Sequence, residues 1–171
     1  MGKRSIKKDK NIYFQIREEE KHLTRSEAAE LLDVTSESRL EKIEYGEVLP
    51  QPEDILAMAN AYKHPELCNY YCTHECVIGK QTMKPIELRN LSEIILKMLA
   101  SLNEIDSEKN RLIEITADGK ISDDELHDFA KIQDRLEQIS TAVESLKLWV
   151  NNTIAQGNID EVKLEAARKK I

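Results

Sequence analysis

LTRSEAAELLDV (residues 23–34), followed by RLEKIEYGEVLPQPEDILAMANAY (residues 39–62), is the part of this sequence that decides its fold. In the first stretch, Thr24 and Glu27 have the spacing of a capping box, which predicts a helix that begins there and ends at the following aspartate. A short connection then leads to a second helix that ends near a tyrosine-glycine pair. Pro52 suits the first position of a further helix. Because each helix is apolar on one side, we expect them to share a core.

An earlier helix is predicted over residues 11–20, because Ile12 and Ile16 lie one helical turn apart. Together the four short helices of residues 11–62 predict one small domain. The side chains expected to face its core are Ile12, Ile16, Ala28, Leu31, Leu32, Leu40, Ile43, Ile55, Leu56, Met58, Ala59 and Tyr62.

The second half of the chain predicts two long helices, because after Pro85 it contains no proline and only two glycines. Two series of residues alternate steps of three and four, as in a heptad seam: Leu88, Leu91, Ile95, Met98, Leu102, Ile105, Lys109 and Leu112, then Phe129, Ile132, Leu136, Ile139, Val143, Leu146 and Val150. Between the series, Gly119 suits a helix stop, and Ser122 and Glu125 form a second capping box. The two helices, each about 45 Å long, should fold back on each other.

The predicted fold class is therefore all-α, a small domain followed by a long antiparallel, coiled-coil-like helical hairpin. We divide the chain into a basic arm over residues 1–10, the domain over residues 11–62, a cysteine-containing connector over residues 63–84, and the hairpin with a short terminal helix over residues 85–171. No apolar run approaches the roughly 20 residues needed to span a bilayer, and the amino terminus lacks the apolar stretch of a signal peptide. A cytoplasmic location is expected.

Charge restricts how such a protein could bind nucleic acid. The net charge is −7, and residues 1–80 contain 12 Lys and Arg against 15 Asp and Glu, which leaves −3. Neutralising phosphates supplies much of the affinity for DNA, so any DNA-binding surface must be a local patch. The clearest basic segment is the arm, which contains Lys3, Arg4, Lys7, Lys8 and Lys10.

Residues 11–62 resemble the phage-repressor-like, or XRE, helix-turn-helix proteins. The resemblance rests on LTRSEAAELLDV and on the glutamate-x-glycine ending followed by a proline and a leucine-alanine helix. It implies that the helix from about Ser36 to Glu44 enters the major groove while the preceding helix lies across the DNA backbone. The contacts that it implies are Ser36, Glu37, Ser38, Arg39 and Lys42 for bases or phosphates, and Thr24, Arg25 and Ser26 for phosphates. The arm adds Lys7, Lys8 and Lys10.

Three features depart from the family pattern. The segment from Val34 to Glu44 is one residue longer than usual, so the turn or the recognition helix must absorb an insertion. Asp33 stands where a turn glycine is common, a position that aspartate tolerates better than most residues. Glu37, Glu41 and Glu44 are expected to be exposed, and they would repel phosphates unless they point away or accept from a cytosine amino group.

The resemblance implies a sequence-specific DNA-binding transcriptional regulator that binds double-stranded DNA, with the hairpin as the oligomerisation region of a homodimer. The alternative, favoured by the acidic balance, is a protein-protein adaptor that binds a protein partner through the hairpin and uses the helix-turn-helix module as a docking domain. The sequence contains no phosphate-binding loop, nucleophile elbow or metalloprotease motif. We therefore expect neither enzymatic activity nor membrane association.

The connector contains a set of soft metal ligands, which has the composition of a zinc or iron-sulfur site: Cys68, Cys72, His74 and Cys76. On a continuous helix, however, the outer two cysteines would lie about 12 Å apart along the axis, too far for one metal ion. The alternatives are that the thiols pack the connector onto the first domain as small hydrophobic groups, or that they act in redox sensing.

Residues 114–125 resemble an EF-hand calcium loop. Glu114 replaces the aspartate that is usual at the first ligand position, and the capped turn between the two long helices already explains Gly119 and Glu125. Calcium is therefore not expected as a cofactor.

Overall fold

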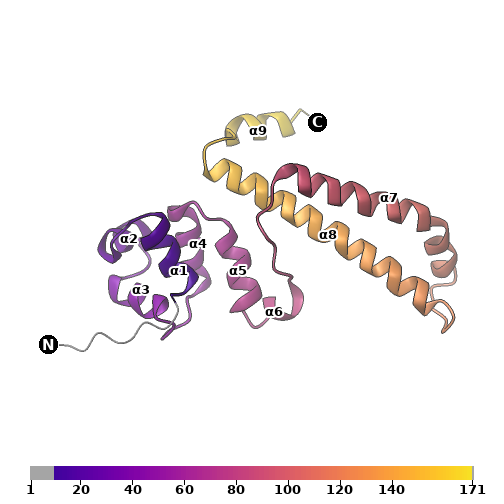
Figure 1. Ribbon diagram of the computed structural model, residues 1–171, viewed down its shortest axis with the longest axis horizontal. Helices are drawn as coiled ribbons and strands as arrows, with labels where there is room; N and C mark the ends of the chain where they lie inside the picture. The colour runs from indigo at the N-terminus through magenta and orange to yellow at the C-terminus, as the bar shows by residue number, and fades with distance from the viewer. Residues whose placement is uncertain (1–9, 171) are drawn as a thin grey trace. The chain divides into compact units, whose positions relative to one another are not determined.

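The computed structural model describes residues 10–170, and in this range it contains helices and no strand (Figure 1). In chain order the helices are α1 (Ile12–Phe14), the π-helical η1 (Gln15–Glu20), α2 (Arg25–Leu32), α3 (Glu37–Glu44), α4 (Pro52–Tyr62), α5 (Glu66–His74), α6 (Gly79–Thr82), α7 (Leu91–Thr116), α8 (Leu126–Ala155) and α9 (Glu161–Arg168). The predicted all-α class is confirmed. None of these described helices is both long enough and apolar enough to cross a membrane.

The described residues divide into two compact units. The first runs to Pro85 and includes Ala155–Asp160, and the second comprises Ile86–Ile154 and the residues from Glu161 onward. In the first unit, α1 contacts α3, α2 contacts α3 and α4, and α4 contacts α5. These helices enclose one apolar core, whose buried members are Tyr13, Ile16, Ala28, Leu32, Leu40, Ile43, Ile55, Met58, Ala59, Tyr62 and Leu67.

Two leucines expected in this core are exposed instead. Leu31 and Leu56 are each 57% exposed. On α2, Ala28 and Leu32 make the inward face, and on α4 the inward positions follow the i, i+3, i+4, i+7 spacing from Ile55, which excludes Leu56. The prediction was wrong for both residues because a short helix buries a narrower face than its apolar composition indicates.

The first predicted helix changes geometry partway along its length. From Gln15 it is π-helical, and the Lys21 amide donates to the Ile16 carbonyl at 2.9 Å. The wider turn leaves both Ile16 and Arg17 buried, although they are adjacent in sequence. The side chain of Arg17 is therefore buried among the helices of the first unit.

The first unit continues past Tyr62 into α5 and α6. Leu67 of α5 is fully buried in the core. α6 approaches α5 closely, because a Cβ atom at Gly79 would lie 2.1 Å from the carbonyl oxygen of Cys72. Only glycine permits this approach. Much of the predicted connector, residues 63–84, therefore forms part of the first unit.

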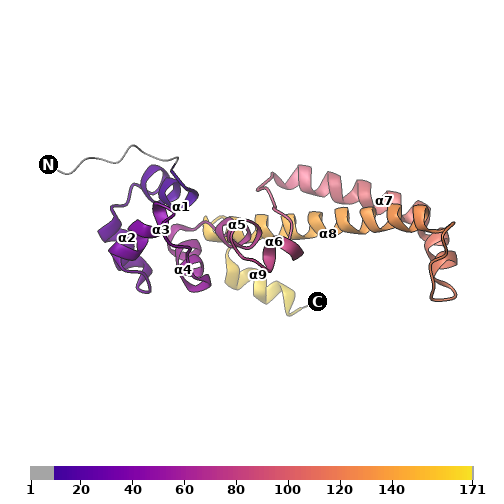
Figure 2. The ribbon, with the colours of Figure 1, turned by 90° about the horizontal axis from the view of Figure 1, so that it is seen from below.

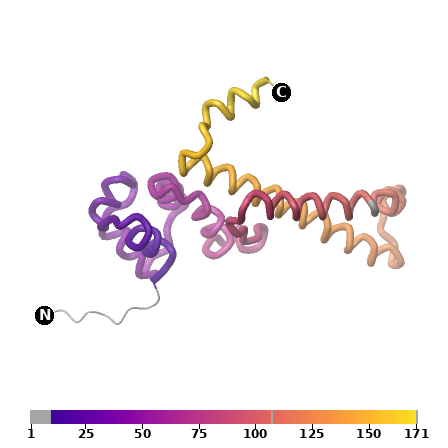
Figure 3. The backbone as a smooth tube through the Cα atoms, turned by 45° about the horizontal axis from the view of Figure 1, so that its top comes forward, coloured from indigo at the N-terminus to yellow at the C-terminus, as the bar shows by residue number. Residues whose placement is uncertain are grey.

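The second unit is built on α7 and α8, which run antiparallel. Figures 1 and 2 show the two helices side by side, and Figure 3 shows the chain reversing between them. Three ion pairs join them: Arg111 to Asp128 at 2.6 Å, Glu108 to Lys131 at 2.5 Å, and Glu104 to Arg135 at 2.8 Å. From one ion pair to the next, the α7 residue number decreases while the α8 residue number increases, as is expected for antiparallel helices. The reversal contains Gly119 at φ +72° and the predicted cap, in which the Ser122 amide donates to Glu125 at 2.9 Å. The predicted hairpin is confirmed.

On α7 the buried residues are displaced by one residue from the predicted seam, whereas on α8 the seam residue Ile132 is buried as predicted. On α7 the buried residues are Ile94, Ser101 and Ile115, spaced by seven and fourteen, next to the seam positions Ile95 and Leu102. Periodicity alone does not decide which of two adjacent lines on a wide apolar face meets the neighbouring helix. Several seam residues are consequently exposed: Leu102 by 41%, Leu136 by 49% and Val143 by 37%.

Candidate nucleic-acid interface

α2, α3 and the turn between them form the segment predicted to contact DNA. α2 begins at the predicted capping box, where the Thr24 amide donates to Glu27 Oε2 at 2.7 Å and the Glu27 amide donates to Thr24 Oγ1 at 3.3 Å. It ends at Asp33, which takes the left-handed conformation at φ +56°. Ser36 then caps α3 by accepting from the Arg39 amide at 3.3 Å. α3 then runs without interruption from Glu37 to Glu44.

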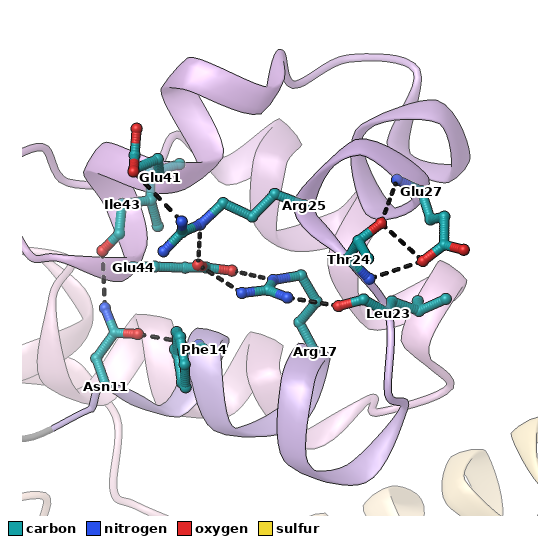
Figure 4. A network of polar contacts seen from close by, with 10 residues as sticks. All are labelled: Asn11, Phe14, Arg17, Leu23, Thr24, Arg25, Glu27, Glu41, Ile43 and Glu44. Atoms are coloured by element: carbon teal, nitrogen blue, oxygen red, sulfur yellow. Dashed lines mark hydrogen bonds and ion pairs between the residues drawn. The ribbon is translucent and has the colours of Figure 1, made fainter.

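A buried carboxylate at the end of α3 ties three helices together (Figure 4). Glu44 has no exposed side-chain surface. It accepts from Arg17 Nε, from Arg17 Nη2 at 2.9 Å, and from Arg25 Nε at 2.8 Å. Arg17 Nη1 also donates to the Leu23 carbonyl at 2.5 Å. Two guanidinium groups thus compensate one carboxylate, and these charge-assisted bonds hold α3 against η1 and α2.

The expectation that Glu44 is exposed and faces phosphates is therefore wrong, because its carboxylate points into the domain. Of the other two predicted carboxylates, Glu37 is exposed in the first turn of α3. Glu41 is 50% exposed and lies 3.3 Å from Arg25 Nη1. The negative charge that α3 presents to solvent is thus smaller than its composition indicates.

Arg39, predicted to contact DNA from the recognition helix, is held by a carboxylate of α4. Its Nε and Nη2 atoms donate to Asp54 Oδ2 at 3.1 and 2.6 Å. Asp54 also accepts from Thr35 Oγ1 at 2.5 Å and from the Gln51 amide at 2.8 Å. Burial alone would raise the pKa of Asp54, but the bonds from Arg39, Thr35 and Gln51 lower that pKa overall. The Arg39 side chain, 33% exposed, is therefore presented to solvent from a defined position.

Exposed side chains at helical spacing form a stripe along the outer face of α3, and the stripe ends at the residue that follows the helix. Its members are Ser38, Glu41, Lys42 and Tyr45. Tyr45 is 57% exposed, and the Arg25 guanidinium lies 5.1 Å from its ring centroid. Tyr45 was not among the predicted contacts, although its helical spacing from Ser38, Glu41 and Lys42 places it on the same face. The remaining predicted contacts are exposed at helix starts: Ser36 and Glu37 at α3, and Thr24 and Ser26 at α2. Hydroxyl, ammonium and phenol groups in this arrangement can bond to phosphates or base edges.

Comparison with known families agrees with this geometry. A family model described as a helix-turn-helix domain matches residues 15–71. Residues 15–71 are a helix-turn-helix domain. The predicted resemblance is confirmed, and the match reaches into α5, past Tyr62, where we predicted that the domain ends. No match was found among characterised proteins, and none was found among solved structures.

Most of the basic arm that precedes the helix-turn-helix domain lies outside the described residues, including Lys7 and Lys8. Lys10 is described: its Nζ atom lies 2.5 Å from Glu19 Oε1 and 4.7 Å from the centroid of the Phe14 ring. A contact of Lys10 with DNA phosphates would therefore compete with these two interactions. The role of the arm stays a prediction.

The three cysteines are half-buried thiols on and just after α5. Burial raises the pKa of Cys68, and so favours its neutral thiol. His74 stacks on Tyr70 at a centroid distance of 4.4 Å. Within residues 10–170, no three His, Cys, Asp or Glu side chains lie close enough together to hold a metal ion. Metal binding by Cys68, Cys72, His74 and Cys76 would need α5 to rearrange, and it stays a prediction.

Proposed function

We propose that this protein is a sequence-specific DNA-binding transcriptional regulator whose helical hairpin joins two copies. The observation that carries the proposal is the outer stripe of α3. In a helix-turn-helix domain, this stripe presents a hydroxyl, a carboxylate, an ammonium and a phenol group to solvent, while Glu44 anchors the end of the same helix. A recognition helix held in place before binding loses little conformational freedom when it enters the major groove. We propose a cytoplasmic regulator without enzymatic activity.

In the proposed complex, α3 lies in the major groove and α2 crosses the sugar-phosphate backbone. Arg39 and Lys42 would reach base edges, and Arg39 has the planar group suited to a bidentate contact with guanine. Glu37 and Glu41 would accept from cytosine amino groups or select against other bases. The side chains assigned to phosphates or flanking base edges are Thr24, Arg25, Ser26, Ser36, Ser38 and Tyr45.

Ion pairs within the domain reduce the repulsion that its acidic residues would otherwise exert on DNA phosphates. Glu44 and Asp54 are both buried and bonded to arginines, so their carboxylates do not confront phosphates directly. The same pairs occupy Arg17 and Arg25, which leaves few cations for the DNA backbone. We therefore expect modest affinity from one domain. Two linked domains on a two-part site would bind more tightly through effective concentration.

Selection from a random duplex library with the full-length protein tests the proposal. The wild type should enrich a motif with two similar halves. Lys42→Ala should lose preference at one or more positions of each half. Lys80→Ala is the matched control, because Lys80 is an exposed lysine of the same unit on α6, which does not belong to the α2–α3 segment. The proposal is wrong if the wild type enriches no sequence over the input library.

A second candidate function is an adaptor that binds a protein partner through the hairpin. The observation in its favour is that Arg17, Arg25 and Arg39 all bond to carboxylates of their own domain. Purification from crosslinked cells of the source organism separates the two functions. A stoichiometric partner protein recovered without DNA supports the adaptor, and enrichment of discrete DNA sites supports the regulator.

A further inference from the structure

Asp54, a buried carboxylate in the first turn of α4, engages one edge of the Arg39 guanidinium and leaves another edge open. Arg39 Nε and Nη2 donate to Asp54 Oδ2 at 3.1 and 2.6 Å. A guanidinium carries five N–H groups in one plane. The two that Asp54 accepts lie on the edge that includes Nε, so the end edge, formed by Nη1 and the second N–H of Nη2, remains. Within the described part of the chain, no residue bonds to Arg39 Nη1.

The other two arginines of residues 15–71 use their Nη1 atoms inside the domain. Arg17 is 4% exposed, and its Nη1 donates to a backbone carbonyl. Arg25 donates from Nη1 to Glu41 at 3.3 Å. Arg39 therefore differs from both, because its pair of parallel end-edge donors is left for an acceptor outside the domain.

Asp54 is itself held in one position by bonds from three directions. Besides Arg39, it accepts from Thr35 Oγ1 at 2.5 Å and from the Gln51 amide at 2.8 Å, and its side chain is 4% exposed. Burial raises the pKa of Asp54, but the bonds from Arg39, Thr35 and Gln51 lower that pKa overall, so the carboxylate is ionised at neutral pH. A fixed carboxylate fixes the plane of the guanidinium that it binds. The direction of the Arg39 end edge is thus set before DNA is bound, which reduces the cost of ordering this side chain.

Arg39 lies where a recognition helix reads bases. It is in the first turn of α3, and the first residues of a recognition helix are the ones that contact base edges in the major groove. There, guanine presents two neighbouring acceptors, N7 and O6. Adenine presents an acceptor beside a donor, thymine an acceptor beside a methyl group, and cytosine a donor. Two parallel donors held in a fixed direction therefore match guanine and no other base.

We propose that Asp54 is a positioning residue that restricts Arg39 to guanine at one base pair of the DNA site; this rests on the proposed function and names the base that the site reads. Asp54 also brings a negative charge close to DNA, which opposes attraction to phosphates. Its contribution is therefore to discrimination between sequences and not to general affinity. A carboxylate that served only the fold would, on removal, weaken binding to every sequence equally.

Competition titrations of the full-length protein on variants of its selected duplex test the proposal. The base pair in question is the one at which Arg39→Ala loses its preference. Replacing guanine by adenine there should weaken wild-type binding about 5-fold to 150-fold. Replacing it by 7-deazaguanine, which lacks only the N7 acceptor, should weaken binding by about tenfold. Asp54→Asn should reduce the guanine-to-adenine ratio by about twofold to tenfold, because Arg39 must then be ordered on binding. Its affinity for a scrambled duplex should not fall, because a negative charge has been removed.

Gly79→Ala is the matched control, because it strains the same unit at Cys72 without touching Arg39 or Asp54. It should leave the guanine-to-adenine ratio unchanged. Circular dichroism checks that each variant is folded. If Asp54→Asn is not, Thr35→Val takes its place, since it removes one of the bonds that orient Asp54. The 7-deazaguanine measurement needs only the wild type.

Three results would overturn the proposal: a base pair that depends on Arg39 but is not guanine, a 7-deazaguanine duplex that binds like the guanine duplex, or equal changes of the ratio in Asp54→Asn and Gly79→Ala. Each of these leaves the DNA-binding function standing, because the wild type still selects a site. A wild type that enriches no sequence refutes the proposed function itself, and this proposal with it.

Discussion

Glu44→Gln should strongly destabilise the helix-turn-helix domain. The change keeps the shape of the side chain but removes the negative charge that Arg17 and Arg25 both contact. The Arg17 side chain is 4% exposed, so its guanidinium would stay buried without a counter-charge. Removing one partner of a buried ion pair costs about 3–5 kcal/mol. Small domains are stable by about 5–15 kcal/mol, so Tm should fall by more than about 10 °C.

Urea and thermal unfolding followed by far-UV circular dichroism measure this loss. The only tryptophan, Trp149, lies in α8, so its fluorescence reports on the hairpin separately. Glu41→Gln is the matched control, since Glu41 shares the helix and the partner Arg25 but is 50% exposed. Its cost should be at most about 1 kcal/mol. The argument fails if Glu44→Gln costs no more than Glu41→Gln.

Three further predictions concern residues 1–85. Asp54→Asn should lower stability at neutral pH. Because folding lowers the pKa of Asp54, the extra stability of the wild type is fully present above the unfolded-state pKa of Asp54 and is lost as the pH falls through its folded-state pKa. In urea titrations at several pH values, the free energies of unfolding of the two proteins should therefore converge in acid. Gly79→Ala should destabilise the domain by about 1–3 kcal/mol, because the new Cβ meets the Cys72 carbonyl and the backbone must move; equal midpoints in urea would contradict this. Deleting residues 1–10 should weaken binding to all duplexes, and should reduce the slope of log binding constant against log salt concentration by about 0.9 for each lost phosphate contact. Arg39→Ala should instead reduce the preference for one sequence over another. Titrations at several salt concentrations, on the selected site and on a scrambled duplex, distinguish the two effects.

Much of the candidate interface could be predicted because its signals lie within a few residues of one another. The Thr24 cap, the left-handed Asp33 and the start of the recognition helix at Ser36 all appear in the structure as expected. The partners of Glu44 and Arg39 could not be predicted in the same way. Arg17 precedes Glu44 by 27 residues and Asp54 follows Arg39 by 15, so their pairing depends on how the helices pack.

The sequence by itself determined that the chain is helical, about where the helices of residues 11–62 and of the hairpin start and stop, and that a hairpin follows a helix-turn-helix domain; it did not predict α5 or α6. Caps, breakers and periodicity act over one or two helical turns, and they need no distant partner. Only the tertiary structure decided that Leu31 and Leu56 are exposed and that Leu102 lies outside the line packed within the hairpin. A helix with a wide apolar side can present any of several adjacent lines to its neighbour, and the choice is made by the surfaces that it meets, which no local pattern specifies.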